Sequence, residues 1–312
     1  HLKDDPRVVA DGEVDLVAGS RPNQQYPIEP EKLRVFPDDS DIPNDELNTT
    51  IDEHFVPMAQ VEPPKEGEFD SWKARLEAEL RRVTFRCFPE RIPPAKPTEQ
   101  GPSDEVWLET EEGIKVPLRS KASPQEAEET KRILLVVENA DSDGEDSDWP
   151  GRVQEPGDAV YLCAPRGVGP TRWTRKDPPN YVERSHVLLG RTVDTGRIRD
   201  VVAVARYLRD KHNGEVPVYV SGERAAGVLA AYAAVCEPEI AGAILNDPPL
   251  SHMQADAPQL LNVLRVCDVP DALGMIAPRP LSIRGVDRES LAKTAAIYAS
   301  AGKTSNFVVE VD

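Results

Sequence analysis

The chain has 312 residues, enough for one α/β domain of ordinary size with an additional segment. Its 37 basic and 55 acidic residues give a formal net charge of −18, which argues against a nucleic-acid or anionic-membrane surface because both of those partners are polyanions. No run of about 18 apolar residues occurs, so we expect no segment that inserts into a membrane.

The first 66 residues predict an extended, acidic N-terminal arm. They carry 16 acidic and 6 basic residues and many prolines, with neither a helical nor an alternating apolar period. Short apolar clusters at residues 33–36 and 55–58 are suited to pin the arm onto a protein partner or a second copy of the chain, and simple disorder is the alternative. Because the chain begins at His1 rather than Met, we expect a processed product or a fragment of a longer protein. A soluble chain exported after processing is compatible with this, and the compartment stays open.

Residues 67–104 predict one amphipathic helix followed by a proline-rich connector. Apolar residues recur in the helix at spacings of four, four and three, namely Trp72, Leu76, Leu80 and Val83. Prolines then break the chain, and two apolar runs in residues 106–118 flank Glu-Glu-Gly, which indicates a hairpin. Pro117 lacks a backbone N–H, so it predicts that the second strand of the hairpin lies at a sheet edge.

Beyond residue 130, apolar runs alternate with helical patterns, which is typical of βαβ units and a parallel sheet. The expected strands are residues 133–137, 159–163, 216–220, 241–245, 281–283 and 307–311. The expected helices are residues 195–209, 225–236, 257–267 and 288–301. In open parallel sheets ligands bind beyond the carboxyl ends of the strands, so we expect the functional residues in the loops at that edge.

Four segments of residues 105–312 are distinctive: Ala164-Pro-Arg-Gly-Val-Gly-Pro170, Leu188-Leu-Gly-Arg-Thr-Val-Asp-Thr-Gly-Arg-Ile-Arg-Asp200, Gly222-Glu-Arg-Ala-Ala-Gly227 and Ile276-Ala-Pro-Arg-Pro-Leu281. Together they resemble the α/β-hydrolase superfamily, and more closely its acetyl-xylan-esterase and prolyl-oligopeptidase-like branch. The resemblance implies an α/β-hydrolase-like domain over residues 105–312, with a mostly parallel, doubly wound sheet. It also implies a nucleophilic serine in a G-x-S-x-G elbow, where small residues on both sides allow the strained turn that lifts the hydroxyl toward the substrate.

The elbow segment departs from that pattern at its central residue. With Gly222 aligned to the first glycine of the pattern, Arg224 stands where the serine is expected. An always-protonated guanidinium cannot act as a nucleophile. Ser221 ends the strand before the turn and is a displaced candidate nucleophile, although the elbow geometry would point its side chain elsewhere.

The resemblance also implies positions for the acid and the base of a triad. It places the catalytic acid at or near Asp287, in the turn after a late strand. A histidine is implied after the last strand, where the sequence shows only Asp312, so a base outside this chain stays open. Inside the chain, His252 follows a strand and is the best candidate base, with Ser251 beside it as a candidate nucleophile. His186 is the second candidate base, and a polar histidine without a catalytic role is the alternative for both.

The loop after the strand at residues 133–137 departs from the resembled family as well. At this position the family places small residues whose N–H groups can face an oxyanion. Residues 138–148 instead hold six carboxylates, which would oppose a developing negative charge. We expect a solvated acidic loop and no cofactor. A weaker alternative is a calcium site, although the glycine spacing does not match an EF-hand loop, and its ligands would be Asp141, Asp143, Asp146 and Asp148.

With nucleophile, base and oxyanion loop all altered, the sequence predicts a catalytically degenerate α/β-hydrolase-like module with a binding or structural role in a larger protein or complex. The first alternative is an active serine esterase or peptidase with an unconventional or externally completed triad, built from Ser221 or Ser251 with His252 and Asp287. The second is a carbohydrate- or peptide-binding module that reuses the cleft, with Arg224 facing an anionic group or a loop carboxylate.

Overall fold

The computed structural model describes residues 30–51, 55, 57–101, 104–121, 130–139, 149–173 and 181–310, and the chain divides into two compact units, His1–Pro57 and Met58–Asp312. The described part of the first unit holds the short helix α1, Pro30–Leu33, and the 3-10 turn η2, Asp39–Asp41. The second unit begins before the predicted end of the arm at residue 66 and includes the predicted proline-rich connector.

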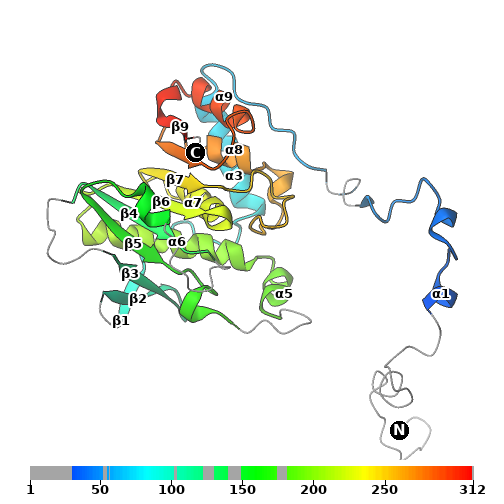
Figure 1. Cartoon of the computed structure of the whole chain (residues 1–312), viewed down its shortest axis with the longest axis horizontal. Helices are drawn as coiled ribbons and strands as arrows, with labels where there is room; N and C mark the ends of the chain where they lie inside the picture. Colours follow the sequence, from blue (N-terminus) through cyan, green and yellow to red (C-terminus); the bar gives the residue numbers. More distant parts are fainter. Residues whose placement is uncertain are drawn as a thin grey trace, which may run out of the picture. The chain divides into compact units, whose positions relative to one another are not determined.

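In the described part of the second unit, a nine-stranded sheet forms the frame (Figure 1), with the strand order β1-β2-β3-β5-β4-β6-β7-β8-β9. The strands are β1 Lys96–Gln100, β2 Glu105–Glu111, β3 Ile114–Ser120, β4 Arg132–Val137, β5 Asp158–Cys163, β6 Val218–Glu223, β7 Gly242–Asn246, β8 Leu281–Arg284 and β9 Phe307–Glu310. β1, β2 and β3 pair antiparallel, as do β3 and β5, and every other neighbouring pair is parallel. The structure confirms the predicted α/β fold with a mostly parallel sheet.

Apolar side chains are buried on both faces of this sheet. Along β4, Ile133 and Leu135 belong to the larger hydrophobic cluster, whereas Leu134 and Val136 belong to the smaller one, because successive strand residues face opposite sides. Side chains of α3, α6, α7, α8 and α9 join the larger cluster, and those of α4 join the smaller one. The helices are α3 Phe69–Val83, α4 Trp149–Val153, α5 Tyr181–Leu188, α6 Val193–Lys211, α7 Arg224–Cys236, α8 Val269–Gly274 and α9 Ala292–Ser300, with 3-10 turns η3 Gly169–Thr171, η4 Val263–Arg265 and η5 Thr304–Asn306. This two-sided burial explains why the parallel strands are continuous apolar runs in the sequence.

Helix α3 and the β2–β3 hairpin form where the sequence predicts them. The prediction for Pro117 is wrong, since β3 lies between β2 and β5 rather than at the edge of the sheet. The missing N–H is tolerated because the β3–β5 ladder begins only at Leu118, and the carbonyl of Pro117 accepts a hydrogen bond from the N–H of Ala164 at 3.4 Å. The proline therefore stands at the end of a ladder, where no donor is needed.

The prediction of a helix over residues 257–267 is also wrong. That segment holds only η4, and Asn262, just before it, takes a positive φ of 62° that no α-helix continues through. The backbone of Pro258 and Gln259 bonds to side chains from other segments instead of forming helical hydrogen bonds. Tertiary contacts override the local apolar spacing at this point of the chain.

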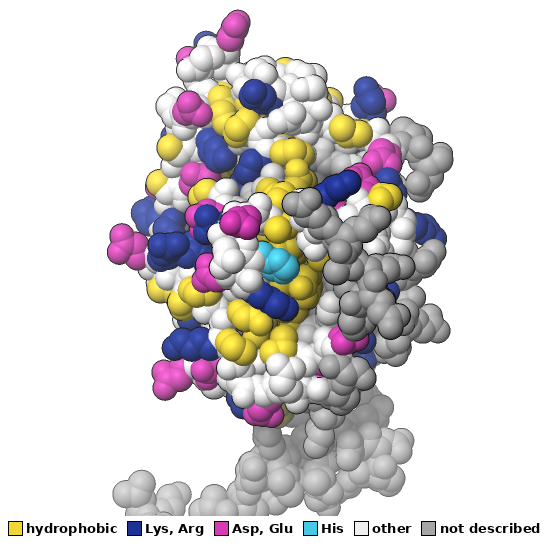
Figure 2. Space-filling view, turned by 90° about the vertical axis from the view of Figure 1, so that its left-hand side faces the viewer, with side chains coloured by type: hydrophobic (Ala, Val, Ile, Leu, Met, Phe, Trp, Pro, Cys, Tyr) yellow, Lys and Arg dark blue, Asp and Glu magenta, His cyan; other side chains and the backbone are white. Residues whose placement is uncertain are grey.

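Negative charge is concentrated in the predicted arm. Residues 1–66 carry 16 acidic and 6 basic residues, which leaves 39 acidic and 31 basic residues for the rest of the chain. Figure 2 shows a face on which Lys and Arg side chains alternate with Asp and Glu side chains around a central band of apolar ones. This face therefore presents no large field of a single sign. Among the residues that the structure describes, no helix is both long and apolar enough to cross a membrane.

Candidate functional site

The turn between β6 and α7 has the geometry of a nucleophile elbow. Arg224 at its apex has a φ of 49°, in the left-handed region that residues other than glycine rarely adopt. A Cβ on Gly222 would lie 2.6 Å from the carbonyl carbon and oxygen of Ala226, so the first turn of α7 approaches the strand end at a distance that only glycine permits. Such a tight turn presents its central side chain at the carboxyl edge of the sheet. In this chain that side chain is a guanidinium, 63% exposed.

Ser221 lies away from the apex of this turn. Its side chain is fully buried, and its Oγ accepts a hydrogen bond from Nε1 of Trp149 at 3.0 Å. Trp149 belongs to the smaller hydrophobic cluster, on the α4 side of the sheet. Ser221 therefore stabilises the packing of an indole ring and is not accessible to a substrate.

Ser251 and His252 are tied to Asp268, the N-cap of α8. Asp268 accepts hydrogen bonds from Oγ of Ser251 at 2.6 Å and from the N–H of His252 at 2.8 Å. The imidazole of His252 contacts the hydroxyl of Tyr232 through Nε2 at 2.8 Å and the carbonyl oxygen of Pro258 through Nδ1 at 3.0 Å. Burial lowers the pKa of His252 and so favours its neutral form. With both ring nitrogens engaged, this histidine is paired with neither candidate nucleophile.

Asp287 and His186 make only local contacts. Asp287 follows β8 and is exposed; it accepts hydrogen bonds from Oγ of Ser290 at 2.6 Å and from the Ser290 N–H at 2.9 Å, and the hydroxyl contact lowers its pKa. Nδ1 of His186 lies 2.8 Å from the carbonyl oxygen of Val182, one turn earlier in α5. Within the described part of the chain, no hydrogen bond joins a histidine ring to a serine or cysteine side chain. The structure does not assemble a triad from the candidates named in the sequence.

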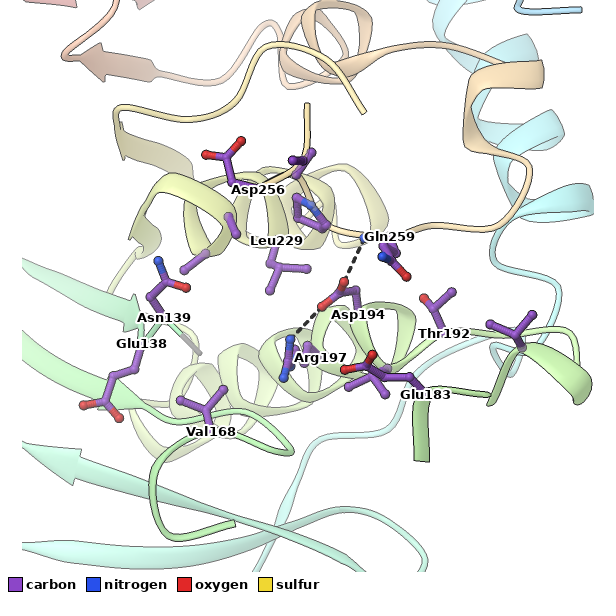
Figure 3. Close-up of a pocket in the computed structure, with 17 residues that line it drawn as sticks. Glu138, Asn139, Val168, Glu183, Thr192, Asp194, Arg197, Leu229, Asp256 and Gln259 are labelled. Atoms are coloured by element: carbon purple, nitrogen blue, oxygen red, sulfur yellow. Dashed lines mark hydrogen bonds and ion pairs between the residues drawn. The ribbon is translucent and has the colours of Figure 1, made fainter. Parts of the chain in front are cut away.

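A pocket of about 250 Å³ lies beside the elbow (Figure 3). Its walls come from the start of the loop after β4, the loop after β5, helix α5, the starts of α6 and α7, and the loop after β7. The lining includes Val168, Asp194, Arg197, Ala225, Ala226, Leu229, Asp256 and Gln259. Arg224 precedes Ala225 of the lining, and its Nη2 is 3.9 Å from a carboxylate oxygen of Asp256, which also lines the pocket. The pocket occupies the edge of the sheet at which the topology predicts a ligand.

A polar cluster joins two walls of the pocket. One carboxylate oxygen of Asp194 accepts a hydrogen bond from Nη1 of Arg197 at 2.8 Å, and the other accepts one from the N–H of Gln259 at 2.8 Å (Figure 3). Nε of Arg197 donates to the carbonyl oxygen of Arg166 at 3.1 Å. Nη2 of Arg197 is buried and has no hydrogen-bond partner among the described residues. The pocket thus contains a guanidinium with unused donor capacity.

Two of the segments that resemble the hydrolase superfamily meet through a buried ion pair. Nη2 and Nε of Arg166, in the loop after β5, donate to the two carboxylate oxygens of Asp200 in α6 at 2.7 and 2.9 Å. Gly196 makes this approach possible, because a Cβ there would lie 2.7 Å from the Arg166 side chain. These residues hold the loop after β5 against α6. Val168 of the loop and Arg197 of the helix therefore line the same pocket.

The acidic loop after β4 is only partly described. Asp141, Asp143, Asp146 and Asp148, the candidate calcium ligands, lie outside the described residues. Glu138 at the start of the loop forms an ion pair with Arg119 of β3. Over the described ranges, no group of three or more His, Cys, Asp or Glu side chains is arranged to hold a metal ion.

The residues that converge on the pocket were not predicted from the sequence, although one of its distinctive segments contains two of them. Asp194 and Arg197 lie in the segment 188–200, and their i, i+3 spacing at the start of a helix is a usable signal for an intrahelical ion pair. Gln259 belongs to the segment that was expected to be helical, so its backbone N–H had no predicted role. Only the tertiary structure brings it to Asp194.

No protein-family model and no curated protein matches the sequence, whereas the fold matches solved structures. A Bacteroides fragilis protein assigned as an acetyl xylan esterase is similar over 81% of this chain and 79% of its own, with a TM-score of 0.61 and 15% identity. A family 15 carbohydrate esterase, a glucuronoyl esterase from Caldicellulosiruptor kristjansonii, is similar over 83% of this chain and 87% of its own, with a TM-score of 0.57 and 12% identity. A glucuronoyl esterase from Solibacter usitatus is similar over 84% of this chain and 95% of its own, with a TM-score of 0.53 and 12% identity. Matches at identities this low show the fold alone. They confirm that the chain has the α/β-hydrolase fold.

Proposed function

We propose that this chain is a catalytically degenerate α/β-hydrolase-fold module that binds a small polar ligand in the pocket beside Arg224, as part of a larger protein or complex. The observation that carries the proposal is the elbow, which keeps its geometry while its apex bears an arginine. A guanidinium is always protonated and cannot attack a carbonyl carbon. The adjoining pocket is nevertheless retained, with its polar cluster in the wall.

The surroundings of His252 support the same proposal. A general base must reach the proton that it removes, directly or through one water molecule. Both ring nitrogens of His252 are instead engaged by Tyr232 and Pro258, and Ser251 is bonded to Asp268. The groups of a triad act as a unit, so an acid such as Asp287 contributes little by itself.

The lining of the pocket suggests the kind of ligand. Carboxylate, amide and guanidinium groups stand beside the apolar side chains of Val168 and Leu229, a combination suited to a small molecule rich in polar groups. Structures with this fold include a family 15 carbohydrate esterase. We therefore favour a saccharide or sugar-acid type of ligand over a peptide.

Covalent labelling tests the loss of catalysis. The native chain is incubated with a fluorophosphonate probe and its intact mass is measured, with an active serine esterase treated in parallel. We expect no stoichiometric adduct on this chain and full labelling of the esterase. We also expect no turnover of short acyl esters between about pH 6 and 9, the range in which a histidine base would act. Stoichiometric labelling of any serine between residues 105 and 312 would contradict the proposal.

We also propose that the first unit contacts a protein partner or a second copy of the chain. Its apolar side chains Val35 and Phe55 are 87% and 74% exposed. Light scattering of the native chain over a range of concentrations tests self-association, and Val35→Asp combined with Phe55→Asp should lower the mass of any oligomer. An oligomer unchanged by these two substitutions would argue against contact through the first unit.

A further inference from the structure

We propose that the pocket beside Arg224 binds a small carboxylate, and that Arg197 is the side chain that recognises it. This inference rests on the proposed function and deepens it by naming the chemical class of the ligand. Its starting point is a donor that the protein leaves unused. Arg197 lies at the start of α6 and lines the pocket, and its side chain is 10% exposed.

Two of the three guanidinium nitrogens of Arg197 are used within the protein. Nε donates to the carbonyl oxygen of Arg166 at 3.1 Å, and Nη1 donates to Asp194 at 2.8 Å. Nη2 is buried without a hydrogen-bond partner in the described ranges. A buried donor without an acceptor is unfavourable, and the guanidinium fork matches the geometry of a carboxylate. A ligand carboxylate at this position would satisfy the unused donor.

Arg197 is held in place from the opposite wall of the pocket. The carboxylate of Asp194 bonds Nη1 of Arg197 through one oxygen and the N–H of Gln259 through the other, which links α6 to the loop after β7 (Figure 3). The guanidinium is therefore oriented before a ligand arrives, and less side-chain freedom is lost on binding.

The start of α7 supplies a second feature that favours an anion. The N-cap Glu223 makes no side-chain capping hydrogen bond, and Ala225 and Ala226 of the first turn line the pocket. N–H groups in the first turn of a helix have no acceptor within that helix. They also carry the partial positive charge of the helix dipole. A carboxylate held by Arg197 would lie in the same pocket as this end of the helix.

Carboxylates that line the pocket are paired with arginine, which reduces their repulsion of an anion. Three of these carboxylates are in such pairs: Glu138 with Arg119, Asp194 with Arg197, and Asp256 with Arg224. The pocket volume of about 250 Å³ is just below the range of about 300–1,000 Å³ typical of drug-sized ligands. A compact acid with a few hydroxyl groups, such as a monosaccharide acid, therefore fits better than an oligomeric chain.

A matched pair of ligands on the native chain tests the inference. D-galacturonate and D-galactose differ in one carboxylate in place of one hydroxymethyl group, and their affinities are compared by calorimetry. We expect the acid to bind about tenfold tighter or more, the effect of a charge-assisted hydrogen bond. Equal affinities for the two compounds, or no binding of the acid, would overturn the inference.

Two arginine variants locate the recognition. Arg197→Gln removes the charge and the fork, and we expect it to lower the affinity for galacturonate about tenfold, to near that for galactose. Arg224→Gln makes the same change at the exposed arginine of the elbow, and we expect less than about a threefold effect there, because an exposed charge is screened. A loss with Arg224→Gln and none with Arg197→Gln would place the recognition at the elbow and overturn the inference.

Thermal unfolding shows whether each variant is folded. If Arg197→Gln does not fold, the ligand pair on the native chain still decides, and Arg197→Lys, which keeps the charge but loses the fork, should bind the acid less tightly than the native chain does. The proposed function fails by a different result, the labelling of a serine by fluorophosphonate, which does not depend on ligand binding. The two failures are therefore distinguishable.

Discussion

Nε2 of His252 lies 2.8 Å from the hydroxyl oxygen of Tyr232, a side chain with no exposed surface. The other ring nitrogen, Nδ1, faces the carbonyl oxygen of Pro258 at 3.0 Å. A carbonyl oxygen can only accept, so Nδ1 carries a proton, and because burial lowers the pKa of the ring and keeps it neutral, Nε2 accepts the hydrogen bond from Tyr232. The best candidate base in the sequence is therefore a neutral histidine that stabilises the packing of α7 against the loop after β7.

Tyr232→Phe should destabilise the fold without any effect on ligand binding. The substitution leaves Nε2 of His252 buried without its donor, and we expect the free energy of unfolding to fall by about 1–3 kcal/mol. Urea denaturation measures the change. Tyr219→Phe is the matched control, because the hydroxyl of Tyr219 makes no hydrogen bond to any described residue, and it should change the free energy of unfolding much less. Equal losses in the two variants would contradict the structural role of the Tyr232–His252 pair.

His252 should also make the stability of the chain depend on pH. Burial lowers its pKa in the folded state below the ordinary value of 6.5, so the unfolded chain binds the proton more readily. The stability that the neutral ring contributes is present above the unfolded pKa and is lost as the pH falls through the folded pKa. We expect His252→Gln to flatten the fall of the unfolding free energy below pH 6.5, measured by urea denaturation at a series of pH values. Parallel curves for the two proteins would show that other groups cause the fall.

The part of the fold that could be predicted from the sequence is the part that local patterns specify. The segment 218–236 has an apolar run, small residues at the turn and an alanine-rich stretch, and it forms β6, the elbow and α7 as expected. The pocket was not predictable in the same way. The bond between Asp194 and Gln259 joins residues 65 positions apart, and that between Ser221 and Trp149 joins residues 72 positions apart. Neither contact leaves a periodic signal in the sequence.

Gly222→Ala should disrupt the elbow more than an ordinary glycine substitution disrupts its site. The added Cβ would lie 2.6 Å from backbone atoms of Ala226, which cannot move without shifting α7, and we expect a loss of about 3 kcal/mol, at the upper end for overpacking. Gly67→Ala is the control, since a Cβ there would meet nothing within 4 Å and only the positive φ of 82° costs stability, about 1 kcal/mol. Urea denaturation compares the two variants. A loss in Gly222→Ala no greater than that in Gly67→Ala would show that the turn is less tight than the structure indicates.

Arg224→Ser tests whether the elbow lacks only its nucleophile or the rest of the site as well. Serine is compatible with the backbone at this position, because active elbows hold a serine in the same strained turn. We nevertheless expect no labelling by a fluorophosphonate probe above that of the native chain, because no histidine ring of the described residues is hydrogen-bonded to a residue of the elbow, where it could take the proton from the new hydroxyl. Circular dichroism verifies that the variant is folded, and an active serine esterase verifies the probe. Labelling of the introduced serine at a rate near that of the esterase would show that a base reaches the elbow, from a part of the chain outside the described residues or from another subunit, and that a single substitution separates this chain from an active hydrolase.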